Sequence, residues 1–214
     1  MKQKTSIIIT ISRQLGSGGA YIGQELAKRL NFYYADREII NKAASQFSVS
    51  SEELTLRDEK QRSFWDYVSE SSFVAPGVYI PPSMTVSPTS GALFEVEKEI
   101  IEHIAEEGNT VIIGRCGFHI FREHPNCVKI FLHSGCRSRI QRASELYNIS
   151  EETATKMIAK SDRERASYCK TFTGKEWANA TNYDISINTE KVGVDKALDF
   201  ILDYLKQAGL FENL

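Results

Sequence analysis

Residues Ile7–Ile22 read IIITISRQLGSGGAYI, a β-branched run followed by a glycine-rich turn and the start of a helical pattern. The short side chains of Gly16, Ser17, Gly18 and Gly19 allow backbone N–H groups to approach a phosphate closely. The N-terminus of the following helix adds unpaired N–H donors and a positive dipole end at the same place. The segment therefore predicts a strand–loop–helix phosphate cradle of the P-loop type.

The loop departs from the usual P-loop pattern, G-x-x-x-x-G-K-[ST], at two positions. If Gly18 is the last glycine of the cradle, Gly19 stands where the lysine belongs and Ala20 stands where the metal-binding hydroxyl belongs. The sequence therefore predicts an anion cradle, built by Gly16–Ala20, that lacks its usual accompanying cation.

The composition fits one domain without a strong overall charge. The chain has 214 residues, of which 42% are hydrophobic, so residues 1–214 can bury the core of a single domain. The 26 basic and 28 acidic residues predict no bulk attraction to nucleic acid or to an anionic membrane, so any basic site must be local. The apolar run near the N-terminus is too short for a signal peptide, and no stretch approaches the roughly 20 apolar residues of a membrane span. We therefore expect a cytoplasmic protein.

Neither the cysteines nor the histidines are spaced as metal ligands. The four cysteines show no C-x-x-C pair, and the four histidines show no H-x-x-x-H or H-E-x-x-H motif. We interpret the cysteines as reduced packing groups and the histidines as ordinary surface or core residues, and we assign no residue to a metal.

Short β-rich runs alternate with helical patterns, which predicts an α/β fold with a parallel sheet. Consecutive apolar residues, as in KIFL, are typical of strands covered on both faces. The expected strands are Ser6–Ile11, Phe32–Tyr34, Thr110–Ile113, Val128–Leu132 and Ile185–Ile187. The expected helices include Gln24–Leu30, Gly91–Glu107 and Ala197–Leu205, and another capped by Ser50 with Glu53. Residues Ser69–Ser90 hold four of the five prolines and predict either a substrate cover or a disordered loop.

Several segments together resemble the cytidylate kinase-like family, a branch of the nucleoside monophosphate (NMP) kinases within the P-loop fold. In the family's order, they are ISRQLGSGGAYIGQELAKRL, FYYADREII, VIIGRCGFHIF, KIFLHSGCRSRIQR and SDRERASYCKTFTGKEW, followed by NYDISINT. They span nearly the whole chain, which makes the resemblance far more specific than a glycine loop alone.

The resemblance implies a three-layer P-loop fold with a five-stranded parallel sheet, a helical NMP-binding insertion and an arginine-rich lid. The core would comprise residues 1–40, 108–150 and 182–214, the insertion about 41–107 and the lid about 151–181. The resemblance also implies transfer of the γ-phosphoryl group of ATP to CMP, dCMP or a related small acceptor, with Mg²⁺ as cofactor. Cytidylate kinases carry the loop lysine and an acidic residue before the Gly-Arg pair that follows the third strand, where this chain has Ile113.

Arginines are expected to carry the chemistry, because phosphoryl transfer needs positioning and positive charge. Arg13 lies in the loop and is the first candidate to replace the absent lysine charge; an exposed loop arginine is the alternative. Arg163 and Arg165 match the family's lid, where arginines close over the transferring phosphates; a solvated helix face is the alternative. Further basic candidates are Arg37, Arg137, Arg139, Arg142, Lys170 and Lys175. Some of the arginines after the fourth strand are expected to be surface charge, and Asp162 is a weaker acidic candidate.

Arg115 and Asp36 are the expected substrate-binding residues. Arg115 follows the third strand, and the resemblance implies that it engages the monophosphate; a structural ion pair is the alternative. Asp36 closes the second strand, and the resemblance implies that it helps to hold the monophosphate or the metal; a helix N-cap is the alternative, and both can hold together. Tyr168, Phe172 and Trp177 are expected to anchor the lid segment rather than to stack on bases.

Two other classes of function are weighed against a kinase. A degenerate kinase that binds nucleotides as a sensor or scaffold would explain the absent lysine, the absent hydroxyl and Ile113. A dinucleotide-dependent oxidoreductase would use Asp36, about 20 residues past Gly16, as its ribose-binding acid. However, its third glycine would fall at Tyr21, and the late arginines have no role in that fold. The expected partners are nucleotide substrates rather than nucleic acid or membrane, and a homodimer is left open.

Overall fold

The computed structural model describes residues 6–36, residue 40 and residues 91–210. The segment predicted as a cover or loop, Ser69–Ser90, lies outside the described residues, as do Ser50, Glu53 and Arg37. Most of the predicted insertion lies outside them as well, apart from the helix at its end.

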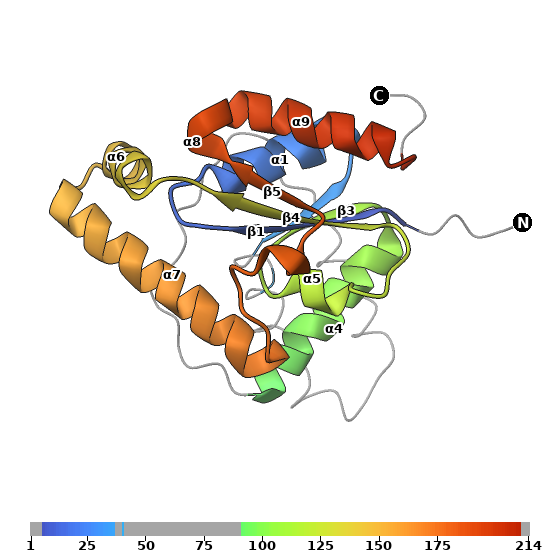
Figure 1. The fold of residues 1–214 in the computed structure, drawn as a ribbon. Coiled ribbons are helices and arrows are strands. Elements are labelled where there is room, and N and C mark those ends of the chain that lie inside the picture. The colour runs from blue at the N-terminus through green and yellow to red at the C-terminus, as the bar shows by residue number, and fades with distance from the viewer. Residues whose placement is uncertain (1–5, 37–39, 41–90, 211–214) are drawn as a thin grey trace, which may run out of the picture.

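A five-stranded parallel sheet forms the centre of the described chain (Figure 1). Its strands are β1 (Ile8–Arg13), β2 (Tyr33–Ala35), β3 (Thr110–Ile113), β4 (Cys127–His133) and β5 (Ile185–Asn188), in the order β2-β3-β1-β4-β5. In the central strand, Ile9 pairs with Val111 of β3 on one side and with Val128 of β4 on the other. Because every pairing is parallel, the carboxyl ends of all five strands meet at one edge, which is where ligands bind in open α/β sheets.

Helices cover both faces of this sheet, which gives three layers (Figure 1). The helices on one face are α1 (Gly19–Leu30) and α9 (Val194–Gln207), and those on the other are α4 (Gly91–Glu107) and the short α5 (Gly117–Ile120). Successive residues of β1 serve the two layers, because side chains alternate along a strand. Ile9 packs with Ile22 of α1, whereas Ile8 packs with Ile100 of α4, and all four side chains are at most 1% exposed.

The remaining α-helices extend the carboxyl edge of the sheet. They are α6 (Cys136–Tyr147), α7 (Glu151–Thr173) and α8 (Thr189–Val192), whereas the 3-10 helix η2 (Ala180–Asn182) precedes β5 and lies at the amino end of that strand. The first half of α7 packs on α6, where Ile158 shares a buried cluster with Ala143 and Leu15. The second half reaches α4, because the Phe172 ring stacks on Phe94 with centroids 4.6 Å apart. The helix α7 therefore runs from α6 to α4 past the loop that follows β1 (Figure 1).

The predicted fold class is confirmed, and so are all five predicted strands within two residues of their ends. The helix Gly91–Glu107 has its predicted bounds. Tyr168, Phe172 and Trp177 belong to one aromatic cluster with Phe94, which agrees with the anchoring role expected for them. Within the described ranges, no helix is both long enough and apolar enough to cross a membrane.

Candidate active site

The loop between β1 and α1 has the geometry of a phosphate cradle. Gly16 and Gly18 have φ values of +82° and +80°, a conformation that L side chains rarely adopt. Ser17 is fully buried, and its N–H and hydroxyl groups both donate to Gln14 O, at 3.2 and 2.8 Å. Gly18 is the N-cap of α1, so the loop ends where the first N–H groups of the helix have no intrahelical acceptor.

Neighbouring strands and helices hold this loop by its backbone. The Gln14 N–H group donates to Leu132 O at 2.9 Å, and Gln14 Oε1 accepts from the Ser134 N–H group at 3.2 Å. The buried Thr189 hydroxyl donates to Ser17 O at 2.9 Å. The loop conformation is therefore fixed by the protein itself, which is the preorganisation that an anion site needs.

Arg13 ends β1 and lies against two glycines. A Cβ added at Gly19 would stand 2.6 Å from Arg13 Cβ and 2.7 Å from Arg13 Cγ. A Cβ added at Gly114, directly after β3, would meet Arg13 Nη1. Burial raises the pKa of Tyr34, the Asp36 carboxylate raises it further, and the Arg13 guanidinium lowers it. The head of Arg13 therefore lies at the carboxyl ends of β2 and β3, in the same corner of the site as Asp36.

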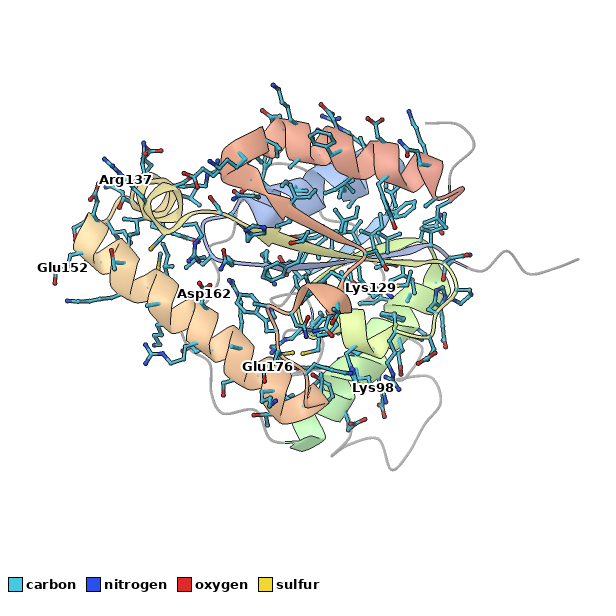
Figure 2. All side chains as sticks on the ribbon, viewed as in Figure 1. Lys98, Lys129, Arg137, Glu152, Asp162 and Glu176 are labelled. Atoms are coloured by element: carbon cyan, nitrogen blue, oxygen red, sulfur yellow. The ribbon has the colours of Figure 1, made fainter. Side chains whose placement is uncertain are left out.

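Arg139 on α6 and Arg165 on α7 reach the carbonyl oxygens of the loop. Arg139 Nη1 donates to Leu15 O at 3.4 Å and to Asp162 Oδ2 at 2.6 Å. Arg165 Nη1 donates to Arg13 O at 3.0 Å and lies 4.0 Å from Asp162 Oδ1. Asp162, labelled on α7 in Figure 2, therefore connects both arginines beside the loop.

A fourth arginine faces the loop, and the other lid arginine does not share these contacts. A Cβ added at Gly18 would stand 2.6 Å from Arg142 Nη1, which places this guanidinium beside the last glycine of the cradle. Arg163 is exposed. Because residues two apart do not share a helix face, Arg163 points away from the loop contact of Arg165. Arg137 is exposed on α6 (Figure 2).

Arg115 forms a buried ion pair with Glu97 of α4. Its Nη2 lies 2.8 Å from Glu97 Oε1, and the two side chains are 8% and 1% exposed. The guanidinium also lies 5.2 Å from the centroid of the Tyr168 ring, whose hydroxyl donates to Glu97 Oε2 at 2.7 Å. Arg115 therefore forms the structural ion pair that the sequence left open as an alternative. A contact between Arg115 and a monophosphate stays a prediction.

Two buried cysteines meet next to this ion pair. Cys116 follows Arg115 and is 5% exposed, and Cys169 on α7 is 1% exposed. A hydrogen bond between the two thiols lowers the pKa of Cys169 to about 7 and, with burial, raises the pKa of Cys116 above its usual range. All four cysteines of the chain are free thiols.

A family model described as the cytidylate kinase-like family matches residues 8–191. The chain belongs to the cytidylate kinase-like family. A cytidylate kinase from Saccharolobus islandicus strain L.S.2.15 is 30% identical over 110 residues. That match covers 51% of this chain and 58% of that enzyme, so it spans little more than half of either protein.

Two solved structures share the fold described above. An uncharacterized protein from Eubacterium ventriosum superposes with a TM-score of 0.69 at 25% identity, covering 94% of this chain and 98% of that one. A shikimate kinase from Bacteroides thetaiotaomicron superposes with a TM-score of 0.52 at 13% identity, over 94% of this chain and 98% of that one. The second likeness concerns the fold alone.

The loop of this family member fits the phosphates of a nucleotide better than it fits a magnesium ion. Backbone donors, a helix N-terminus and several guanidiniums converge on it. Ala20 has no hydroxyl, and the Ser17 hydroxyl already donates to Gln14 O. Within the described ranges, no group of three or more His, Cys, Asp or Glu side chains could hold a metal ion. We therefore assign no magnesium ligand.

The sequence named Arg137, Arg139 and Arg142 as basic candidates and predicted that some of them are surface charge, without indicating which; the structure places Arg139 and Arg142 against the loop. The available signal was their position: they follow β4, whose carboxyl end neighbours that of β1. The contacts of Gln14 and Thr189 with the loop had no sequence signal, because a polar residue near a strand end has many possible partners.

Proposed function

We propose that this protein is a nucleotide kinase that transfers the γ-phosphoryl group of ATP to CMP, dCMP or a related small acceptor. The observation that carries the proposal is the fixed glycine loop at the N-terminus of α1, with arginines around it. The guanidiniums of Arg139, Arg142 and Arg165 lie against the loop, and that of Arg13 lies beside Gly114 at the end of β3. Neutral N–H donors combined with permanent positive charge are what a bound triphosphate requires.

In this proposal the residues of the site bind and orient the reacting groups. The N–H groups of Gly16–Ala20 hold phosphate oxygens of the donor, and the arginines offset the negative charge of its terminal phosphate. The acceptor lies on the side of β2 and β3, where Asp36 and Arg115 are the proposed contacts. An acceptor oxygen then forms its bond to the γ-phosphorus as the bond to the leaving ADP oxygen breaks.

A second candidate is a nucleotide-binding module without phosphoryl transfer. Gly19 and Ala20 favour it, because the loop lacks both the lysine and the hydroxyl of the usual pattern. The burial of Arg115 against Glu97 favours it as well, since a guanidinium in an ion pair offers less to a substrate phosphate.

Turnover separates the two candidates. The purified chain is incubated with ATP and Mg²⁺ and with CMP, dCMP, UMP, AMP or no acceptor, and ADP release and the phosphorylated product are measured. We expect ADP release to depend on a pyrimidine monophosphate. In parallel, ATP at a hundredfold excess over its Kd should raise the free energy of unfolding by about 2.7 kcal/mol. Stabilisation by ATP without turnover on any acceptor would favour the binding module.

A further inference from the structure

Gly19 is not required by the backbone conformation. It begins α1, and its φ lies outside the left-handed region, unlike those of Gly16 and Gly18. Any residue with a side chain could adopt this conformation. The absence of the usual lysine at this position therefore needs another physical reason.

Arg13 supplies that reason, because its side chain fills the space next to Gly19. The atoms that a Cβ on Gly19 would meet, at 2.6 and 2.7 Å, are Arg13 Cβ and Cγ. Cβ is fixed by the backbone and is carried by every residue except glycine, and Cγ could leave only if the whole Arg13 side chain turned about its Cα–Cβ bond. A side chain at position 19 and Arg13 in its present position therefore exclude each other.

Gly114 accommodates the other end of the same side chain. Its φ is +78°, and a Cβ there would meet Arg13 Nη1. Two glycines far apart in the sequence thus leave room for the stem and for the head of one arginine. The head lies beside Gly114, at the end of β3, and its charge acts on the Tyr34 hydroxyl of β2.

We infer that the cation of the phosphate loop has moved from position 19 to position 13. Arg13 supplies the charge that a P-loop lysine would supply, and it approaches the terminal phosphate of a bound triphosphate from the end of β1 rather than from α1. The inference rests on the proposed function only in requiring that the loop binds a nucleoside triphosphate. It makes Arg13 a triphosphate ligand whether or not an acceptor is phosphorylated.

The test compares the affinities for ATP and AMP, measured by titration calorimetry with Mg²⁺, so that no acceptor is needed. Arg13→Ala should weaken ATP binding about 10- to 100-fold, as expected when a hydrogen bond to a charged group is lost. Its AMP affinity should change much less. Arg13→Lys keeps the charge and should stay within a few-fold of the wild type. Arg29→Ala removes an exposed arginine of α1 that pairs with Asp199, and should bind ATP as the wild type does.

The decisive variant returns the positive charge from position 13 to position 19. Gly19→Lys alone should bind ATP poorly, because the new side chain collides with the stem of Arg13. Arg13→Gly/Gly19→Lys removes both colliding atoms and should recover most of the ATP affinity that Arg13→Gly alone loses. Thermal melts show which variants are folded. ATP affinity unchanged in Arg13→Ala would overturn the inference, and so would a folded Arg13→Gly/Gly19→Lys variant that binds ATP no better than Arg13→Gly.

These outcomes are separable from those of the kinase assay. Recovery of ATP affinity in the double variant, together with a wild-type chain that phosphorylates no acceptor, would disprove the kinase and leave Arg13 as the cation of the loop. A chain that phosphorylates an acceptor, but whose ATP affinity does not change when Arg13 is replaced, would support the kinase and disprove the role of Arg13.

Discussion

Asp162 Oδ2 lies 2.6 Å from Arg139 Nη1, and this ion pair joins α7 to α6 beside the phosphate loop. The Arg139 side chain is only 9% exposed, so Asp162→Asn would leave a nearly buried guanidinium without its carboxylate. We expect the free energy of unfolding, measured by urea denaturation, to fall by about 1–3 kcal/mol.

A surface pair of the same length provides the control. Lys156 Nζ also lies 2.6 Å from its partner, Glu152 Oε1, but these side chains are 76% and 79% exposed (Glu152 in Figure 2). Lys156→Gln should therefore cost less than about 0.5 kcal/mol. Equal losses in the two variants would mean that burial adds nothing to the Asp162–Arg139 pair.

The Arg115–Glu97 pair is more deeply buried and should be more sensitive. Glu97→Gln removes the carboxylate charge 2.8 Å from the buried Arg115 Nη2, and we expect urea denaturation to show a loss of about 3–5 kcal/mol. Glu99→Gln, at an exposed position of the same helix, should be nearly neutral. Glu97→Leu/Arg115→Met should recover much of the loss, because replacing both partners removes the unpaired charge. Kinase activity retained in that double variant would contradict the substrate-binding role predicted for Arg115.

These two ion pairs also show where sequence reasoning stops. The strands and the helices at Gln24–Leu30, Gly91–Glu107 and Ala197–Leu205 were predictable, because β-branched runs and three-and-four spacing act locally; the bounds of α7 were not predicted. The sequence did not indicate which of Arg137, Arg139 and Arg142 contacts the loop, because all three lie on one short helix after β4. Only the packing of α7 decides that Arg139 meets Asp162, 23 residues later in the chain. The tight conformation of the loop was predictable from its glycines, whereas the residues that surround the loop have no local sequence signature.

Gly16 is expected to be the glycine of the loop that tolerates substitution least. Its φ is +82°, and an added Cβ would stand 2.7 Å from Arg139 O, a backbone atom that cannot move aside cheaply. Gly174→Ala is the matched control, because Gly174 has a φ of +68° but no atom within 4 Å of an added Cβ. We expect Gly174→Ala to cost about 1 kcal/mol of unfolding free energy for the left-handed backbone alone. Gly16→Ala should cost about 1–3 kcal/mol more, from overpacking, and should also weaken ATP binding. Equal costs would show that the loop can shift away from α6.

The Cys116–Cys169 pair should be visible as a thiol that titrates near neutral pH. The largest cause of the lowered Cys169 pKa, about 7 against an ordinary value of 9.0, is the hydrogen bond from Cys116. Because the folded pKa lies below the unfolded one, the stability contributed by the Cys169 thiolate is fully present above pH 9 and is lost as the pH falls through 7. Thiolate absorbance at 240 nm, taken as the difference from Cys169→Ala, should show this midpoint.

The identity of the hydrogen-bond donor can be tested by substitution at Cys116. Cys116→Ala removes the donor and should move the Cys169 midpoint up toward 9, whereas Cys116→Ser keeps a hydroxyl donor and should hold it lower. The same shift should appear in stability, since Cys116→Ala would flatten the dependence of the unfolding free energy on pH between 7 and 9. A wild-type midpoint near 9 that neither substitution changes would show that the two thiols act independently.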